Sequence, residues 1–377
     1  MSVSDVIAAG VIPQIESEIY QKEDAFFPDS NTIKNLQKKL LIESFEFHYN
    51  NNEVYRRYCD AVKVGIVEVK QDVRNIPLIP STVFKTMKLR TDTNEKTVKS
   101  CLSSGTQGSV STVERDNTTL ERFLGTIRNV TDNVYGLEDA IILNLGPSSE
   151  EAKDLWFSYV MSVSDLLFPE INYVIDDVFR IDLFIKDINR YKDSYRDIMV
   201  IGAPIMFTEL HKYFLQNNIS LDYGDKIFVI TAGGWKKNEG KALTKEKFRS
   251  LCKDMFLNIT DDRIRDAFNM VELNTVLPEC ECGSKHVPLW VDVFAINLDT
   301  YKVAAVGEVG LLGFLDASPI SYPGFVMSGD LGRITHVNNC PCGRNGVCVD
   351  IVRRVNTIES RGCALKIERK YFQDSTE

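Results

Sequence analysis

The spacing of apolar and polar residues divides the chain into three stretches. Residues 1 to about 30 are acidic and only weakly periodic, which predicts an arm lying over the body of the protein. Apolar residues then recur at helical spacing from Ile33 to Tyr49 and again from Val54 to Ala61. Two prolines force the run from Ile76 to Lys85 into an extended path, which leads toward a glycine-containing loop.

In the second stretch, short apolar runs alternate with amphipathic segments. The predicted strands are Ala140 to Leu145, Asn172 to Ile175, Asp197 to Ile201 and Lys226 to Thr231. The predicted helices are Glu151 to Phe168, Phe207 to Leu215, Lys245 to Met255 and Asp262 to Phe268. A repeat of strand, glycine turn and helix is typical of an α/β fold with a mostly parallel sheet, which binds ligands at the carboxyl ends of its strands.

The third stretch, beyond Glu272, is rich in strands. The predicted strands are Val287 to Leu298, Glu308 to Leu315, Gly324 to Met327 and Ile334 to Val337. We therefore expect a large domain over residues 31–354 with a β-rich subdomain at about 276–352. Residues 355–377 would form a short C-terminal tail.

Composition narrows the class of protein. The 377 residues are 44% hydrophobic and 26% charged, as in ordinary globular proteins, and the formal net charge of −9 argues against a general affinity for nucleic acid or anionic membranes. The N-terminus lacks the pattern of a secretory signal, and no run approaches the roughly 18 apolar residues of a membrane span. We expect a cytoplasmic protein whose nine cysteines are reduced thiols, metal ligands or catalytic groups.

The segment from Ser103 to Ser109 is the first candidate for chemistry. Its glycines and hydroxyl residues could bring backbone N–H and O–H groups close to a phosphate. A helix follows, because Leu120, Phe123 and Ile127 fall on one face after the turn formers Asp116 and Asn117. A flexible glycine and serine connection would have the same composition, so the loop alone does not decide between the two interpretations.

Two cysteine pairs have the same form, C-x-C-G. They are Cys280 with Cys282 and Cys340 with Cys342, each pair followed by a glycine that can adopt positive φ. Two such pairs predict a structural zinc site with four sulfur ligands, for which His286 or Cys348 could replace one cysteine. The alternative is a set of four reduced thiols.

Several landmarks, in order, resemble those of a known family. They are Ser103-Ser104-Gly105-Thr106, Ala232-Gly233-Gly234-Trp235-Lys236, Val271-Glu272-Leu273-Asn274-Thr275, Lys285-His286-Val287-Pro288, Asp316-Ala317-Ser318, Ser328-Gly329-Asp330-Leu331, Arg353-Arg354-Val355-Asn356-Thr357 and Gly362-Cys363-Ala364-Leu365. The chain resembles the adenylate-forming acyl ligases and, more closely, the LuxE-type acyl-protein synthetases of the bacterial bioluminescence fatty acid reductase complex.

The resemblance implies the large-domain fold of these ligases and a binding site for ATP and Mg²⁺. Residues that would hold the β- and γ-phosphates are Ser103, Ser104, Gly105, Thr106 and Gly108. Residues that would line the adenine and acyl pocket are Gly233, Gly234, Glu272 and Asn274. Asp330 would accept hydrogen bonds from both ribose hydroxyls, and Arg354 would lie near the ribose and the α-phosphate.

The resemblance also assigns the acyl-transfer step. Cys363 would take the acyl group from the acyl-adenylate as a thioester and pass it to a partner protein, such as an acyl reductase or a carrier. Nearby basic residues favour its thiolate form, although a lone cysteine of this kind can also be inert. His286 would lie at the pocket rim and orient the substrate or take a proton, unless it is a zinc ligand or a structural histidine.

Four departures from the patterns of the family and its superfamily affect these expectations. No lysine follows the hydroxyl loop, so phosphate contacts would come from the backbone, hydroxyls or Arg115. Asn274 and Thr275 stand where relatives carry the acidic residue for Mg²⁺, which leaves Glu272 as the nearest carboxylate. The cysteine pairs look like those of phenylacetate-CoA ligase relatives, and the tail is too short to form the mobile small domain of the large ligases.

The leading hypothesis is therefore ATP-dependent activation of a carboxylic acid, with a fatty acid as the expected substrate. Acyl transfer to Cys363 and delivery to a protein partner would follow. The alternatives are an acyl- or aryl-CoA ligase, which would not need Cys363, and a catalytically weakened accessory subunit that keeps the same fold.

Overall fold

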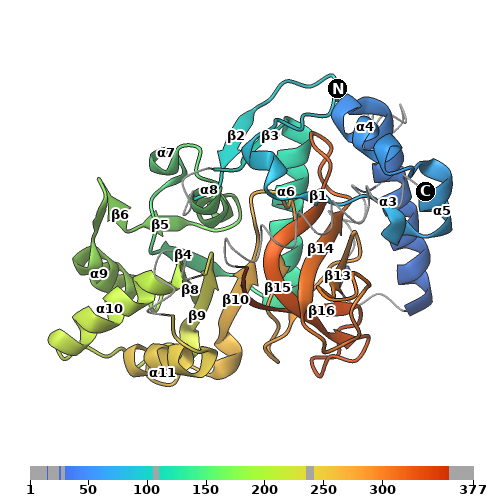
Figure 1. Cartoon of the computed structure of the whole chain (residues 1–377). Coiled ribbons are helices and arrows are strands. Elements are labelled where there is room, and N and C mark those ends of the chain that lie inside the picture. The colour runs from blue at the N-terminus through green and yellow to red at the C-terminus, as the bar shows by residue number, and fades with distance from the viewer. Residues whose placement is uncertain (1–14, 16–24, 27–29, 105–109, 235–241, 356–377) are drawn as a thin grey trace.

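Two six-stranded sheets form the centre of the molecule (Figure 1). The computed structural model describes residues 15, 25–26, 30–104, 110–234 and 242–355. One sheet is mostly parallel, with strand order β11-β10-β9-β8-β4-β5, and the other is mostly antiparallel, with order β12-β16-β15-β14-β13 and β1 paired to β15. The predicted α/β class, with a β-rich part in the C-terminal half, is confirmed.

The parallel sheet comes from the middle of the chain. Its strands are β4 (Ala140–Asn144), β5 (Glu170–Asn172), β8 (Asp197–Gly202), β9 (Ile227–Ala232), β10 (Ile264–Phe268) and β11 (Leu277–Pro278). One face packs on α9 (Ile181–Tyr191), α10 (Pro204–Gln216) and α11 (Lys245–Met255). The other face packs on α6 (Asn117–Val130) and α8 (Trp156–Ser162). Because both faces are covered, β4, β8 and β9 are buried along their whole length.

The antiparallel sheet comes from the last third of the described chain. Its strands are β12 (Lys285–His286), β13 (Val291–Ile296), β14 (Gly310–Asp316), β15 (Phe325–Val337) and β16 (Val347–Arg354), together with β1 (Ile79–Pro80). On its outer side lie α3 (Ser30–Asn51), α4 (Glu53–Ala61) and α5 (Ile66–Gln71), the blue helices of Figure 1. Gln37 on α3 donates a hydrogen bond of 2.6 Å to the carbonyl of Val291, which ties this layer to β13.

A hairpin and a central helix connect the two sheets. The hairpin consists of β2 (Lys99–Leu102) and β3 (Thr112–Arg115), and α6 follows it directly. Asp116 caps α6 by accepting a hydrogen bond from the backbone N–H of Thr119. At its other end, α6 passes into a π-helical turn over Thr131–Tyr135, which ends at Gly136 with a φ of 66°. Other short elements are α7 (Ser149–Ala152), β6 (Val174–Ile175), β7 (Val178–Phe179) and several single turns of 3-10 helix.

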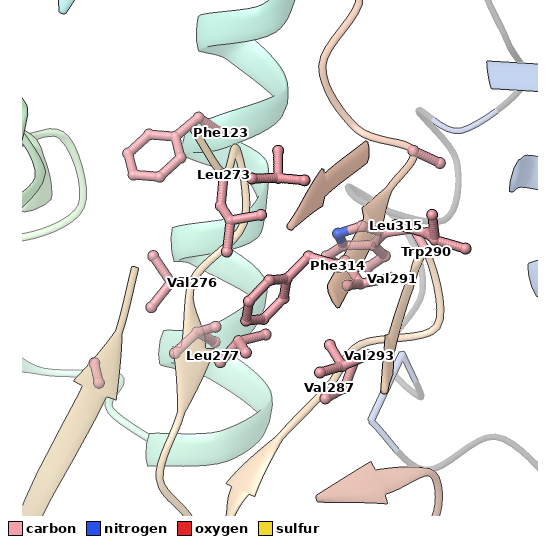
Figure 2. Packing of buried hydrophobic residues seen from close by; sticks show 14 of the residues in the cluster. Phe123, Leu273, Val276, Leu277, Val287, Trp290, Val291, Val293, Phe314 and Leu315 are labelled. Atoms are coloured by element: carbon pink, nitrogen blue, oxygen red, sulfur yellow. The ribbon is translucent and has the colours of Figure 1, made fainter. Parts of the chain in front are cut away.

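The main hydrophobic core lies between α6 and the two sheets. Figure 2 shows Phe123, Leu273, Val276 and Phe314 facing this shared interior. Phe123 comes from α6, Leu273 and Val276 come from the segment before β11, and Phe314 comes from β14. The core therefore fixes the segment between β10 and β11 against both α6 and the antiparallel sheet.

Two predicted helices are wrong in whole or in part. The segment from Asp262 to Phe268 is mainly strand β10. Its pairing with β9 and β11 stabilises a strand there in spite of the helical spacing of its apolar residues. The single helix predicted from Glu151 to Phe168 is interrupted at Lys153, whose φ is 53°. The carbonyl of Asp154 there accepts a 2.7 Å hydrogen bond from the N–H of Leu102, so the break connects this region to β2.

Several other predictions agree with the structure, although the strand predicted from Asn172 to Ile175 is divided between β5 and β6, and the one from Val287 to Leu298 is shorter, as β13. The predicted helix from Lys245 to Met255 is α11 with the same bounds, and the helices predicted near Ile33 and Phe207 are α3 and α10. The two short strands predicted at Gly324 to Met327 and Ile334 to Val337 are parts of one long strand, β15.

Candidate functional site

The hairpin of β2 and β3 holds the two ends of the predicted phosphate loop together. The N–H of Ser103 donates to the carbonyl of Ser111 at 3.0 Å, and the N–H of Ser111 donates to the hydroxyl of Ser103 at 2.9 Å. The hydroxyl of Ser103 therefore helps to close the loop, while Ser104 is exposed. Gly105, Thr106 and Gly108 lie outside the described residues.

A glycine turn follows β9 at the carboxyl edge of the parallel sheet. Gly233 and Gly234 have φ values of 81° and 59°, in the region that favours glycine. A Cβ atom on Gly233 would lie 2.4 Å from the ring of Phe157, so no side chain fits there. This turn is at the edge of the sheet where the resemblance places the ligand.

Three charged residues meet where the parallel sheet faces β15 and β16. Burial raises the pKa of the Glu272 carboxyl, while a hydrogen bond from Ser111 and the charge of Arg354 oppose this shift. Burial also raises the pKa of Asp330, and the charge of Arg354 again opposes it. Asp330 and Arg354 are paired across β15 and β16. The structure thus brings together Glu272, Asp330 and Arg354, which the sequence placed in one site.

Asn274 has a different environment from the one predicted. It is completely buried, its amide nitrogen donates to the carbonyl of Thr119 at 2.8 Å, and its amide oxygen accepts from Arg115 at 3.1 Å. Its backbone N–H donates to Asp316 at 3.0 Å. Both ends of the Asn274 side chain are therefore engaged inside the protein, so it supports the segment rather than offering a free group to a nucleotide.

Arg115 is buried beneath the site and does not reach the phosphate loop as a surface group. Its side chain is 0% exposed and donates to the carbonyls of Val271 and Leu273 at 2.7 and 3.2 Å. The centre of its guanidinium lies 3.6 Å from the ring centroid of Trp156. The suggestion that Arg115 contacts phosphate from the loop is therefore not supported, since its donors point to the segment carrying Glu272.

A second cluster consists of thiols and an imidazole. The Sγ atoms of Cys280 and Cys340 are 3.8 Å apart, and those of Cys340 and Cys342 are 3.3 Å apart. Nε2 of His286 lies 3.3 Å from the Sγ of Cys342. One ligand atom from each of these four residues lies within 4.8 Å of the others, so the cluster could hold a metal ion. We call Cys280, His286, Cys340 and Cys342 the thiol–imidazole cluster.

Each cysteine pair turns tightly at its glycine. The N–H of Gly283 donates to the carbonyl of Cys280 at 2.9 Å, and the N–H of Gly343 donates to the carbonyl of Cys340 at 3.0 Å. Both glycines have positive φ, at 78° and 83°, as their place in the motif predicts. The first turn lies between β11 of the parallel sheet and β12 of the antiparallel sheet, so the cluster joins the two sheets.

His286 stands in the cluster where the sequence predicted Cys282. Cys282 is exposed and lies outside the cluster, whereas Cys280 is buried and belongs to it. His286 is buried against Cys342 and Cys348 rather than at a pocket rim. Burial, aided by the charge of Arg344, lowers the pKa of His286 to about 4, which keeps the imidazole in the neutral form that binds metals.

Cys363, the proposed acyl carrier, lies outside the described residues. Among the described residues, sequence reasoning missed the supporting role of Arg115 and Trp156. The sequence identifies Arg115 as a cation and Trp156 as an aromatic residue near the predicted site. It does not show their contact, which joins positions far apart in the chain. No helix in the described ranges is long and apolar enough to cross a membrane.

Comparison with known proteins gives a consistent result. The model of the family described as "Acyl-protein synthetase, LuxE" matches residues 9–372. A long-chain-fatty-acid–luciferin-component ligase of Aliivibrio fischeri is 39% identical over 336 residues, which cover 89% of this chain and 88% of the relative. The corresponding ligase of Vibrio harveyi is 34% identical over 340 residues, covering 90% and 89%.

A solved structure is similar in fold at much lower identity. A crystal structure of 2-hydroxyisobutyryl-CoA ligase, in an open conformation with 2-HIB-AMP and CoA, superposes with a TM-score of 0.68 at 11% sequence identity. The match covers 91% of this chain and 74% of that one. The chain therefore has the fold of the adenylate-forming acyl-CoA ligases, as the sequence predicted.

Proposed function

Since the chain belongs to the LuxE family of acyl-protein synthetases, we propose that it activates a long-chain fatty acid with ATP and delivers the acyl group to a protein. The family match over residues 9–372 carries this proposal, because it spans both sheets and reaches Cys363. The proximity of Glu272, Asp330 and Arg354 to one another supports it.

The first step joins the acid to AMP. An oxygen of the carboxylate attacks the α-phosphorus of ATP, the bond from that phosphorus to the bridging oxygen breaks, and pyrophosphate leaves with the electron pair. The loop from Ser103 to Ser109 would hold the leaving phosphates. Asp330 would accept hydrogen bonds from the ribose hydroxyls, and Arg354 would stabilise charge on the α-phosphate.

Glu272 is our candidate for the carboxylate that assists Mg²⁺. Mg²⁺ brought in with ATP would neutralise negative charge on the phosphates. Glu272 is the carboxylate of the segment from Val271 to Thr275. Burial raises its pKa, and the hydroxyl of Ser111 and the charge of Arg354 act against that shift. The side chain of Asn274 is engaged with Arg115 and Thr119, which leaves Glu272 to this role.

The second step moves the acyl group to Cys363. Its thiolate attacks the carbonyl carbon of the acyl-adenylate, the bond to the phosphate oxygen breaks, and AMP leaves. Arg353, Arg354, Arg361 and Lys366 are close in sequence and would favour the thiolate. A nucleophile on an acyl reductase or a carrier would then take the acyl group from the thioester.

The thiol–imidazole cluster would hold a structural Zn²⁺. Tetrahedral zinc with bonds of about 2.3 Å to sulfur and about 2.0 Å to nitrogen separates its ligand atoms by about 3.6–3.8 Å. Three of the pairs among these four residues are 3.3 to 3.8 Å apart, and all of the ligand atoms lie within 4.8 Å of one another, which is near that geometry. Three thiolates and one imidazole also suit zinc chemically, and four protein ligands leave no open position for catalysis.

A labelling experiment tests the acyl-transfer proposal. The protein is incubated with ATP, Mg²⁺ and radiolabelled long-chain fatty acid, and both pyrophosphate release and protein-bound label are measured. We expect a hydroxylamine-labile label on the wild-type protein. Cys363→Ala should lose that label and still form the acyl-adenylate, because adenylation precedes the thioester.

The exposed thiol of Cys282 supplies a matched control. Cys282→Ala should keep both pyrophosphate release and the label, since Cys282 lies outside the thiol–imidazole cluster. A label that persists in Cys363→Ala would refute the thioester. Release of product only with CoA would favour the acyl-CoA ligase, and no pyrophosphate release with any of a panel of acids would favour the accessory subunit.

A further inference from the structure

We propose that Arg115 is a positioning residue for adenylation, and this inference rests on the proposed function. It would hold the segment with Glu272 in register with the base of the phosphate loop. Arg115 is the last residue of β3, and β3 begins one residue after Ser111, which closes the loop with Ser103. Its side chain leaves the hairpin and reaches the segment between β10 and β11.

The contacts of Arg115 suit a guanidinium and no other side chain. Nη2 donates to the carbonyls of Val271 and Leu273 on either side of Glu272, at 2.7 and 3.2 Å. Nε donates to the amide oxygen of Asn274 at 3.1 Å. A planar, forked donor can reach these acceptors together, whereas the single ammonium of lysine cannot do so in the same plane.

Aromatic rings complete the environment of Arg115. Its guanidinium lies 3.6 Å from the ring centroid of Trp156 and donates to the hydroxyl of Tyr322 at 3.0 Å. Trp156 in turn donates to Asn269 at 2.6 Å. Asn269 donates to the carbonyls of Leu273 and Thr275. The backbone on both sides of Glu272 is therefore held from Arg115 directly and through Trp156.

The charge of Arg115 has a second consequence. No carboxylate of the described residues forms an ion pair with Arg115, and its Nη1 has no hydrogen-bond partner among them. A buried cation is costly when no anion is near, and the neutral carbonyls compensate only part of that cost. Its positive charge would therefore favour an anionic ligand near the end of β3, in addition to its effect on position.

The test separates substrate binding from use of ATP. Arg115→Lys keeps the positive charge and loses the forked N–H donors of the guanidinium, whereas Arg115→Met loses both. For each variant, we would measure the Kd for fatty acid without ATP, the rate of acid-dependent ATP–pyrophosphate exchange, and Tm. We expect kcat/KM for ATP to fall at least tenfold in Arg115→Lys and further in Arg115→Met, with the Kd for fatty acid within twofold of wild type.

Arg263 provides the matched control. It also donates to a backbone carbonyl, that of Ile227 at 2.9 Å, and lies 5.4 Å from the ring centroid of Phe228. However, it lies at the amino end of β9, away from the site. Arg263→Lys should lower Tm without changing the ratio between fatty-acid binding and ATP use.

Each outcome of this experiment supports or contradicts the proposal. Exchange in Arg115→Lys within twofold of wild type, per folded molecule, would refute it. An equal loss of ATP use in Arg263→Lys would also refute it, because a general loss of stability would then explain both. If the wild-type protein itself catalysed no exchange with any acid, that result would contradict the proposed function, on which the role of Arg115 rests.

Discussion

Two buried polar clusters join the parallel sheet to the rest of the molecule, and their polar groups are stabilised in different ways. Arg115 is surrounded by backbone carbonyls, an amide and aromatic rings, which engage Nε and Nη2 and leave only Nη1 without a partner among the described residues. The thiol–imidazole cluster instead brings together groups that are weak hydrogen-bond partners for one another. The first cluster is nearly complete with protein atoms alone, whereas the second would gain its main stabilisation from the metal ion proposed for it.

Because of this difference, substitutions in the two clusters should affect different properties of the protein. Changes around Arg115 should alter the use of ATP and be insensitive to metal. Changes in the thiol–imidazole cluster should alter stability and depend on metal, because metal binding to a folded site adds its free energy to that of folding. The following experiments test this contrast in order of expected effect.

Loss of a cluster cysteine should have the largest effect. Cys340→Ser should abolish stoichiometric zinc, since it removes the thiol that lies closest to two other cluster thiols. We expect the free energy of unfolding to fall by several kcal/mol, about 3 or more. Metal analysis and chemical denaturation measure the two effects.

Cys282→Ser is the control for that experiment. Because Cys282 is exposed and outside the cluster, its zinc content should stay at one per chain and its stability should change by less than about 0.5 kcal/mol. Equal losses of zinc and stability in both variants would instead support the four-cysteine site that the sequence predicted. A chelator that left Tm of the wild-type protein unchanged would contradict any structural metal.

Lowering the pH should have the next largest effect on stability, through the protonation of His48. Burial, with a smaller contribution from the charge of Arg122, lowers the pKa of His48 to about 3, while an unfolded histidine titrates near 6.5. The unfolded chain therefore binds the proton first as pH falls below 6.5. Stability is fully present above that pH and declines toward pH 3, by about 2–3 kcal/mol at pH 4.5.

His48→Gln isolates this contribution. His48 donates through Nε2 to the carbonyl of Pro319 at 3.1 Å and accepts through Nδ1 from Thr91 at 2.9 Å, and an amide can form similar hydrogen bonds. Denaturation from pH 7 to 4.5 should show a shallower loss of stability in the variant. Identical pH profiles would mean that His48 does not remain neutral in the folded protein.

The smallest of these effects should follow Trp156→Phe. Phenylalanine keeps a ring beside Arg115 but removes the hydrogen bond of 2.6 Å to Asn269 and weakens the cation–π contact. We expect a loss of about 1–2 kcal/mol of stability. ATP use should fall while zinc content is unchanged, and a parallel loss of zinc would show that the two clusters are not independent.

Local patterns predicted the elements and the order of the site better than its contacts. The apolar runs of β4, β8 and β9 and the face of α11 were strong signals, because both depend on residues close in sequence. The segment from Asp262 to Phe268 failed because its strand character comes from pairing with β9 and β11, which no local pattern contains.

The site shows the same limit. The glycines of the two cysteine pairs predicted positive φ correctly, since the motif itself requires it. The choice of His286 over Cys282 depends on β12 pairing with β16, where His286 faces Cys348. The burial of Arg115 and Asn274 against each other joins residues 159 positions apart, and one sequence cannot show that contact.

The length of α6 sets the distance between the two clusters. The helix starts two residues after Arg115 and, with its π-helical turn, ends where Arg344, next to the second cysteine pair, donates to the carbonyls of Asn133 and Val134. Its 14 residues span about 21 Å. One inserted or deleted residue would rotate its ends relative to each other by about 100°. We therefore expect a single-residue insertion or deletion within α6 to disturb the orientation of the two clusters relative to each other, whereas a substitution on its exposed face would not.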